Sequence, residues 1–470
     1  MGGDVFPGIS REIDELKEKL FESLRQQVKI PSVEGAPAEN APFGPAVAEA
    51  LDHVLALGAS LGFEAENHGG YVGTIDWGEG KELLGILAHV DVVPPGDLSA
   101  WETPPYEMTE TDGMVRGRGV ADDKGPLLSS LYGMYALKKT GFRPNKRVRI
   151  IVGTNEETGW GCMKYYTAHC ETPTMGFSPD GMFTVVNREK GILSLALAKK
   201  LPGDLFSGIS MEGGEAVNLV PAAASARLAM PDKERLAALK RAAESLPETL
   251  GSVSISEKDG NLFIAVKGKS AHAMTPEKGV NAIGGLFRLL VSPGCLSDRE
   301  KEELETVLNL LGDQPDGNAL GLACSDEVSG GLTLNLGMFR LSGGELTLRF
   351  DMRTPVTCSI EELAGRLVSR FEREGYAKTE ERIKKPLYVP ADSPLIQKLC
   401  GVYEKVTGEK SVLYSIGGGT YARAFPNCVC FGSVYPGEEL TVHSPNERTA
   451  AANILRNAKM YGLAVYELTK

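Results

Sequence analysis

The chain has 470 residues, of which 42% are hydrophobic and 24% charged, and its formal net charge is −12. This length exceeds one ordinary hydrophobic core and predicts two or three domains, while the composition is typical of a soluble globular protein. The negative charge argues against a nucleic-acid partner, because binding phosphates requires clustered Lys and Arg side chains.

The sequence also lacks the features of export and membrane insertion. The N-terminal segment MGGDVFPGISREIDELKEKL contains neither an apolar signal region nor a cleavage-site pattern. No run approaches the roughly 20 apolar residues that a membrane span requires. Eight cysteines spread along a chain of this length do not indicate a disulfide framework. We therefore expect a cytoplasmic protein without a membrane partner.

The first part of the chain alternates between helical and strand patterns. Apolar periodicity predicts a helix from Ser10, as its N-cap, to Val28, and a second helix over Pro45–Leu61. Apolar runs predict strands at Tyr71–Trp77 and Leu83–Val93, and a helix follows at Gly125–Lys139. This alternation predicts an α/β domain whose mixed, largely parallel sheet is flanked by helices.

The pattern changes near residue 190, where strands of antiparallel type are interleaved with helices. The predicted strands are Ile192–Lys200, Ala222–Met230, Leu262–Val266, Leu332–Phe339 and Glu345–Arg353, and the predicted helices are Asp232–Ser245 and Asn281–Leu290. The α/β pattern returns from Pro386, with helices over Pro394–Lys405 and Thr449–Leu468. We therefore predict a discontinuous α/β domain of residues 1–189 and 385–470 that contains an inserted α+β domain of residues 190–384.

A short internal echo indicates that the insert has two similar halves. Asn218-Leu219 and Ala226-Arg227-Leu228 in its first part resemble Asn335-Leu336 and Leu348-Arg349-Phe350 in its second part. The match is short, so it predicts a structural repeat without establishing one.

Two adjacent carboxylates follow the most apolar strand of the chain. The run Val148–Val152 ends at Gly153, and Glu156 and Glu157 come shortly after it. In open α/β sheets the functional groups lie beyond the carboxyl ends of buried parallel strands. Two like charges this close repel each other unless a cation compensates them, and successive side chains of an extended chain point apart. We expect the two carboxylates to contact different partners; the alternative is a solvated surface turn.

Further metal-ligand types lie at corresponding places along the chain. His89 and Asp91 share one face of a strand that runs to Val93, so Asp91 can accept a hydrogen bond from the ring of a metal-bound His89. Asp122 stands at the start of a helix, Asp180 lies in a turn and His443 comes late in the chain. Each has an ordinary structural explanation alone, but acids gathered without compensating cations would destabilise the domain. Together they predict a metal centre, and the absence of HExxH excludes a helical single-zinc peptidase.

These residues stand within an ordered set of motifs that resembles a known family. The motifs are LAHVDVVPPGD, GRGVADDKGP, TNEETGWG, SPDG, KGKSAHAMTPEKGVNA, DMRTPV, GGGTYAR and VHSPNE. Over residues 10–465 the chain is similar to the dipeptidase V (PepV) type of the co-catalytic dizinc exopeptidases, relatives of carboxypeptidase G, aminoacylases and carnosinases. It departs from the family at Leu98-Ser99-Ala100, where a shorter Gly-containing link is usual.

The resemblance implies two divalent metal ions held by five side chains. His89, Asp122 and Asp180 would hold one ion. Asp122, Glu157 and His443 would hold the other, so that Asp122 bridges the pair. Zinc is the metal we expect, although manganese and cobalt accept the same His and carboxylate ligands.

The resemblance also implies roles for residues that do not bind metal. Glu156 would be the general base, and Asp91 would orient His89. The insert would be a lid that supplies His272 as a donor to the oxyanion. Relatives with a long insert tend to be monomeric, so we expect a monomer.

The substrate's terminal carboxylate would be bound by residues from both domains. The residues implied are Asn218, Arg353, Gly417, Gly418 and Gly419. Arginine binds a carboxylate with two parallel hydrogen bonds, and stacked backbone N–H groups of a Gly-rich turn can form an anion nest.

The implied activity is hydrolysis of unblocked dipeptides, β-alanyl dipeptides among them, by a water activated between two metal ions with Glu156 as the general base. The sequence leaves open an amidohydrolase of the same class that acts on N-acyl amino acids, because both substrates offer an amide and a carboxylate. A non-catalytic metal-dependent binding protein is a further alternative. The presence of Glu156 argues against it, since a binding protein needs no general base.

Overall fold

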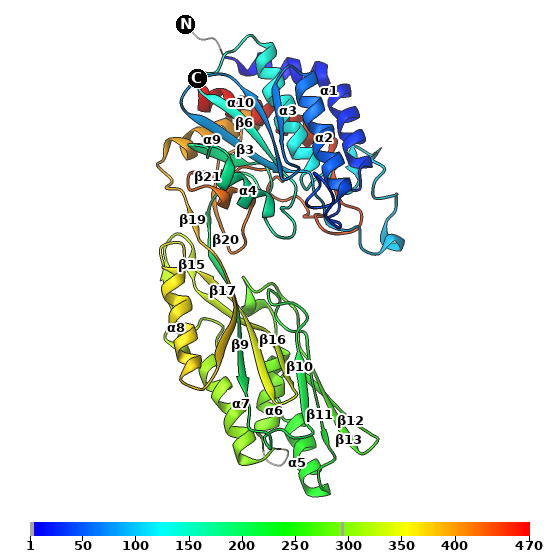
Figure 1. Cartoon of the computed structure of the whole chain (residues 1–470), viewed down its shortest axis with the longest axis vertical. Coiled ribbons are helices and arrows are strands. Elements are labelled where there is room, and N and C mark those ends of the chain that lie inside the picture. The colour runs from blue at the N-terminus through cyan, green and yellow to red at the C-terminus, as the bar shows by residue number, and fades with distance from the viewer. Residues whose placement is uncertain (1–3, 293–295) are drawn as a thin grey trace. The chain divides into compact units, whose positions relative to one another are not determined.

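The computed structural model describes residues 4–292 and 296–470, and the chain divides into two compact units (Figure 1). Unit 1 comprises the residues up to 188 together with 388–414 and 419–470, and unit 2 comprises residues 189–387 and 415–418. The boundaries predicted from the sequence fall at 189/190 and 384/385, and the role of the insert as a lid stays a prediction. The seven described cysteines form no disulfide with one another, and Cys295 lies outside the described residues.

The main sheet of unit 1 is mixed, with a parallel centre. Its order is β1-β2-β6-β3-β7-β21-β8-β19, and β6, β3, β7 and β21 are parallel to one another. The strands are β1 (Glu64–His68), β2 (Val72–Trp77), β3 (Leu83–His89), β6 (Arg147–Gly153), β7 (Met175–Ser178), β8 (Val185–Glu189), β19 (Leu387–Tyr388) and β21 (Cys428–Cys430), and β20 (Leu413–Ile416) pairs with β8. All seven residues of β3 are buried, as expected for an apolar strand covered on both faces. The predicted fold class is confirmed.

Helices cover this sheet, and a small second sheet lies beside it. The helices are α1 (Phe6–Lys29), α2 (Pro45–Ser60), α3 (Lys124–Lys139), α4 (Gly161–His169), α9 (Pro394–Thr407) and α10 (Ala451–Thr469), and the second sheet contains β4 (Thr109–Thr111), β5 (Met114–Arg116) and β22 (Arg448–Ala450). Helices α3 and α10 pack on the central strand β6, and α2 packs on β1 and β2. The predicted start of the first helix is wrong, because Pro7 occupies its first turn and Ser10 lies inside it.

Unit 2 is built on one antiparallel sheet of eight strands. Its order is β12-β13-β11-β10-β16-β17-β9-β18. The strands are β9 (Gly191–Lys200), β10 (Ser210–Gly213), β11 (Ala223–Ala229), β12 (Ser252–Lys258), β13 (Asn261–Lys267), β16 (Thr333–Ser342), β17 (Glu345–Thr354) and β18 (Ala377–Lys384), with a separate hairpin of β14 (Ser325–Asp326) and β15 (Gly330–Gly331). The helices are α5 (Lys233–Glu244), α6 (Ala282–Val291), α7 (Asp298–Leu311) and α8 (Ile360–Glu372).

The sheet of unit 2 consists of two halves with corresponding strands, although β9 comes first in the chain in its half whereas its counterpart β13 comes last. From the centre outward, one half runs β10, β11, β13, β12 and the other runs β16, β17, β9, β18. Helix α5 separates β11 from β12 in the first half, as α8 separates β17 from β18 in the second. The sequence echo matches this repeat only in part: Arg227 and Arg349 lie on corresponding strands, whereas Asn335 lies on β16 and Asn218 in the loop after β10.

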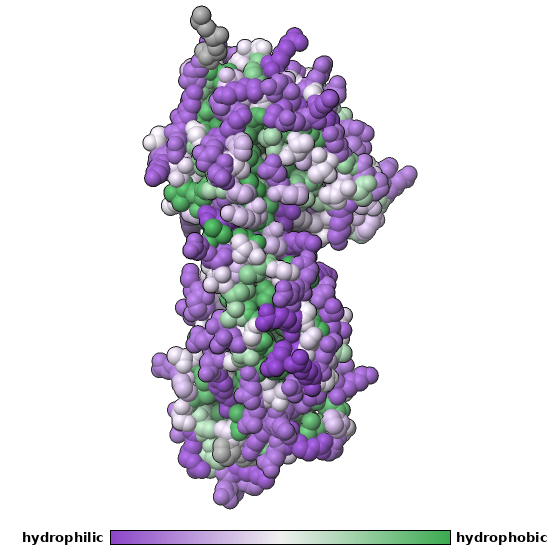
Figure 2. Space-filling view, turned by 90° about the vertical axis from the view of Figure 1, so that its left-hand side faces the viewer, coloured by the Kyte–Doolittle hydropathy of each residue, from purple (hydrophilic) through white to green (hydrophobic). Residues whose placement is uncertain are grey.

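The surface of both units is predominantly polar on the face that Figure 2 shows. Among the described residues, no helix combines the length and the apolar character that crossing a membrane requires.

Two glycines let helices α3 and α10 approach closely. A Cβ atom on Gly133 would lie 2.5 Å from the carbonyl oxygen of Ala458 and 2.8 Å from the nitrogen of Gly462. A Cβ atom on Gly462 would lie 2.8 Å from the carbonyl oxygen of Gly133. These neighbours are backbone atoms, which cannot turn aside as a flexible side chain can.

We predict that Gly133→Ala destabilises unit 1 by about 1–3 kcal/mol, because the added methyl group forces the two helices apart. The matched control is Gly401→Ala in α9, where a Cβ atom meets nothing within 4 Å. That change should be neutral or stabilising by up to about 1 kcal/mol, since alanine favours the helix. Thermal unfolding followed by circular dichroism tests the pair, and equal midpoints for both variants would contradict the prediction.

Candidate metal centre

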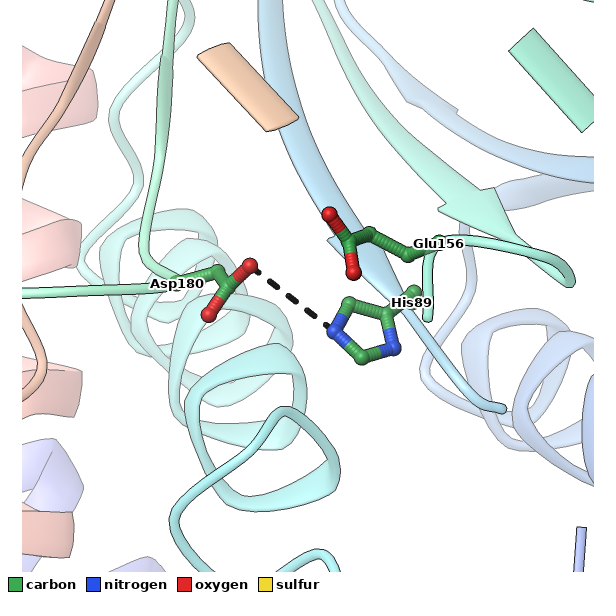
Figure 3. Close-up of side chains that lie close together, drawn as sticks. All are labelled: His89, Glu156 and Asp180. Carbon is green, nitrogen blue, oxygen red and sulfur yellow. Dashed lines mark ion pairs between the residues drawn. The ribbon is translucent and has the colours of Figure 1, made fainter. Parts of the chain in front are cut away.

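Three neighbouring parallel strands end side by side and deliver the first group of polar side chains. His89 is the last residue of β3, Glu156 and Glu157 follow the end of β6, and Asp180 follows the end of β7. Figure 3 shows the side chains of His89, Glu156 and Asp180 directed toward one another, with His89 Nε2 3.8 Å from Asp180 Oδ2. The position beyond the carboxyl ends of the strands is the one expected for a functional site in an open α/β sheet.

Asp122 connects this first group to a second one. Its Oδ1 lies 3.1 Å from His89 Nε2, and its Oδ2 lies 3.0 Å from Nε2 of His443. The same His443 nitrogen is 3.0 Å from Oε2 of Glu157. His443 has a φ of 61°, a left-handed backbone conformation that few residues other than glycine adopt. One carboxylate therefore lies between two imidazoles, with one oxygen toward each.

The geometry of these atoms fits divalent cations better than direct hydrogen bonds. His89 Nε2 and Asp122 Oδ1 are both buried, and neither has a hydrogen-bond partner in the described structure although they lie 3.1 Å apart. Within two groups, ligand atoms lie no more than 4.8 Å from one another: His89 with Glu156 and Asp180, and Asp122 with Glu157 and His443. Such mixed nitrogen and oxygen donors suit zinc and other first-row divalent ions.

Glu156 differs from Glu157 in its surroundings, as the sequence predicts for two diverging side chains. Oε1 of Glu156 accepts a hydrogen bond of 3.2 Å from Nε1 of Trp160, whereas Glu157 faces His443. Glu156 is also close enough to His89 and Asp180 to be counted among the ligands of one ion. In the two-ion assignment, Asp122 is the ligand beside His89. Glu156 is therefore the carboxylate near His89 that is not needed as a ligand. Its role as a base stays a prediction.

The predicted link between His89 and Asp91 has a different form. Strand β3 ends at His89, so the predicted strand to Val93 is too long, although the side chains of His89 and Asp91 lie near each other. His89 Nδ1 lies 2.9 Å from the backbone oxygen of Asp91 and 3.5 Å from Oδ1 of its carboxylate, whose Oδ2 accepts the backbone N–H of Glu157. A hydrogen bond from Nδ1 to the carbonyl leaves Nε2 available as a ligand, and Asp91 also positions the loop that carries Glu157.

Without metal ions, several of the side chains proposed as metal ligands have raised pKa values and so tend to bind protons. Contacts with Asp122 and Glu157 raise the pKa of His443 to about 10. Burial disfavours the charged form of His89, but the nearby Asp122 and Asp91 outweigh it and raise its pKa well above the usual value. Burial, followed by repulsion from neighbouring carboxylates, raises the pKa of Asp180 and brings that of Glu156 to about 7. Protons therefore compete with metal ions for these ligands.

Three residues support the site although the sequence analysis gave them no role. Asp123 accepts the backbone N–H of His89 at 3.0 Å, and Trp160 contacts Glu156 as described. Glu447 is fully buried and binds the loop before Asp122. All three stand inside the motifs that carry the family resemblance, which is the signal that could have drawn attention to them.

In unit 2, Arg353 already has a partner of its own. Its Nε and one terminal nitrogen donate to the two oxygens of Asp351 at 2.6 and 2.8 Å, and its other terminal nitrogen donates to the Gly417 carbonyl at 2.8 Å. A guanidinium has five N–H donors, so these contacts leave one on each terminal nitrogen. Both terminal nitrogens therefore keep a donor that a further acceptor, such as a carboxylate, can use.

His272 is held in a defined tautomer beside this arginine. Its Nδ1 lies 3.0 Å from the backbone nitrogen of Met274, whose N–H it accepts, so the ring proton is on Nε2. Burial and the charge of Arg353 lower the pKa of His272, which keeps the ring neutral near pH 7. The backbone oxygen of Asn218 accepts the N–H of Ala273, so Asn218 and His272 lie on neighbouring segments.

The Gly-rich turn does not have the conformation assumed for an anion nest. None of Gly417, Gly418 and Gly419 has a positive φ. A Cβ atom on Gly417 would lie 2.6 Å from the Met274 side chain, so glycine is required there by close packing. Carboxylate binding by this turn stays a prediction.

The chain is similar to known peptidases along most of its length. A model of the peptidase family M20/M25/M40 matches residues 85–467. The chain is 36% identical to the protein named "Putative dipeptidase YtjP" of Bacillus subtilis (strain 168), over 98% of this chain and 99% of the relative. It is 33% identical to the Beta-Ala-Xaa dipeptidase of Lactobacillus delbrueckii subsp. lactis, over 97% of each. Human carnosine dipeptidase 1 shares the fold, with a TM-score of 0.57 over the full length of both chains and 16% identity.

The raised pKa values predict that metal binding at pH 7 releases protons. In the chain alone His89 and His443 each carry a second ring proton, which each must lose to ligate through Nε2, and the raised pKa of Asp180 adds to this. We therefore expect release of at least two protons when Zn²⁺ is bound. The apparent affinity should therefore rise with pH, because proton competition weakens. Calorimetric titration in two buffers of different ionisation enthalpy measures the release, and heats that are independent of the buffer would contradict the prediction.

Proposed function

The chain belongs to peptidase family M20/M25/M40, and from this premise we propose that it is a metal-dependent dipeptidase that cleaves unblocked dipeptides. The observation that carries the proposal is the position of Asp122 between His89 and His443, with Glu156 beside them as an additional carboxylate. Two ions can share the carboxylate of Asp122, and the additional carboxylate of Glu156 is available for proton transfer. The name of the Lactobacillus relative supports the inclusion of β-alanyl dipeptides among the substrates.

The proposed chemistry assigns separate tasks to the side chains of unit 1. When bound, two divalent cations polarise the scissile carbonyl and acidify the attacking water. Glu156 takes the proton of that water and passes it to the leaving amine. The Trp160 N–H group holds one oxygen of Glu156, which directs the other toward the reacting groups. A base whose pKa is brought near neutrality by burial suits this exchange in both directions.

We assign recognition of the substrate to unit 2. The remaining donors of Arg353 would bind the terminal carboxylate, with Asn218 and the turn at Gly417–Gly419 around it. Asp351 supports this role, because it fixes the plane of the guanidinium without using those donors. The neutral His272, protonated on Nε2, would donate to the oxyanion that forms as the peptide bond is attacked.

The remaining parts of the proposal concern metal, compartment and assembly. The mixed imidazole and carboxylate donors support zinc as the metal, although manganese and cobalt bind to the same donors. A cytoplasmic location is supported by seven cysteines without a disulfide among them. A monomer is supported by the pairing of β10 with β16, through which one chain joins both halves of its own sheet.

We predict that Glu156→Gln lowers kcat by roughly 10²–10⁴-fold while the metal content stays near that of the unmutated protein, because an amide cannot accept the proton of the water. The matched control is the neighbouring Glu157→Gln, which replaces a proposed ligand and should reduce the metal content. Elemental analysis and kinetics on one dipeptide test both variants. A loss of metal from Glu156→Gln would make Glu156 a ligand and refute its role as the base.

We also predict that a dipeptide is a better substrate than its C-terminal amide. The amide loses charge-assisted hydrogen bonds worth about 1.5–3 kcal/mol, which corresponds to roughly 10- to 150-fold in kcat/KM. Arg353→Lys should narrow this difference, since lysine retains the charge but not the paired donors. Comparable kcat/KM for the dipeptide and its amide would refute the carboxylate site, and preferred hydrolysis of an N-acyl amino acid would replace the dipeptidase assignment.

A further inference from the structure

Glu447 is a fully buried carboxylate that lies outside both groups of metal-ligand side chains among the described residues. Its Oε1 accepts three backbone hydrogen bonds, from the nitrogens of Gly119, Ala121 and Asp122 at 3.0, 2.9 and 3.1 Å. Its Oε2 accepts a hydrogen bond of 2.8 Å from Arg118. The loop from Gly119 to Asp122 is therefore wrapped around a single oxygen atom.

These hydrogen bonds act directly on the residue that bridges the two groups. One of the three donors is the backbone nitrogen of Asp122, whose carboxylate reaches both His89 and His443. Hydrogen bonds to an ionised acceptor are shorter and roughly twice as strong as those between neutral groups. A converging set of N–H groups is also the usual way in which a loop holds an anion. The charge of Glu447 thus restrains the backbone from which the bridging carboxylate extends.

Glu447 also belongs to the segment that carries His443. Its backbone oxygen accepts the N–H of Gly117, and the strand that follows it, β22, pairs with β5. The segment bearing His443 and the loop bearing Asp122 are therefore joined at one residue, by its backbone on one side and its carboxylate on the other. His443 Nε2 and Asp122 Oδ2, 3.0 Å apart, come from these two segments.

We propose that Glu447 is a positioning residue that sets the distance between Asp122 and His443 and thereby determines the affinity for the second metal ion. The inference rests on the two-ion site of the proposed function. It assigns Glu447 no contact with substrate or metal. Its effect passes through the backbone of Asp122.

A purely structural role is the competing explanation, because Glu447 forms a buried ion pair with Arg118. Breaking such a pair by removing one partner is strongly destabilising, since the other charge stays buried without compensation. The test must therefore separate metal affinity from stability, and it must not depend on turnover.

The experiment titrates chelator-treated protein with Co²⁺, follows the visible absorbance of the bound ions, and measures thermal unfolding of the same samples. In Glu447→Gln the neutral oxygen still accepts the three N–H groups, but more weakly, and affinity for the second Co²⁺ should fall roughly 10- to 100-fold. The matched control is Asp76→Asn in the same unit. Arg149 donates two hydrogen bonds of 2.7 Å to the Asp76 carboxylate, and the variant replaces that carboxylate with a neutral amide. This control should bind Co²⁺ as the unmutated protein does.

The double variant Glu447→Gln with Arg118→Met separates the two explanations if the single variant folds poorly. Removing the uncompensated cation should restore the unfolding midpoint, while affinity for the second Co²⁺ stays low. Recovery of both properties, or affinity within twofold of the unmutated protein in Glu447→Gln, would overturn the proposal. An unmutated protein that binds only one Co²⁺ ion would refute the two-ion site itself, and the inference with it.

Discussion

Electrostatic compensation at the ends of β3, β6 and β7 is the constraint on which the structure of unit 1 depends. Parallel strands bring the acids that follow them to one edge of the sheet, and burial there strengthens every repulsion between them. Asp122 is the point at which the charges meet, because it faces both His89 and His443. Protons satisfy this arrangement in the chain alone, and two divalent cations would satisfy it in the proposed metal centre. The catalytic geometry and the stability of the sheet edge thus have the same origin.

Unit 2 also contains a buried charge, and a neighbouring side chain of the same strand compensates it. Arg353 is a buried cation, and Asp351 compensates it before any substrate binds. In the proposed site, a substrate carboxylate would therefore not be needed to neutralise the charge and would contribute only hydrogen bonds to the remaining N–H groups. Such an arrangement would favour selectivity over affinity, because the site would be preorganised and the absence of the carboxylate would have only a moderate cost.

Most of the fold follows from local patterns in the sequence, and most of what was missed depends on distant contacts. The apolar runs of β3 and β6 and the acids beyond them were readable. The metal-ligand set that the family resemblance implied stays a prediction, although the structure brings its members close together. The pair of Asp351 and Arg353 was also accessible, since residues i and i+2 share a strand face. The contact of Glu447 with Asp122 was not, because these residues are separated by 325 positions. The early end of β3 at His89 was missed because the apolar run continues beyond the last paired residue.

The crossing of α3 and α10 at Gly133 and Gly462 gives the metal centre a mechanical frame. Asp122 immediately precedes α3, and the segment with His443 and Glu447 leads through β22 into α10. The two helices that touch most closely are therefore the ones that continue from the two halves of the second metal site. Gly133 lies about 14 Å of helix rise from the first residue of α3. A larger side chain at this crossing would push the two helices apart, and we expect it to change the distance between Asp122 and His443 as well.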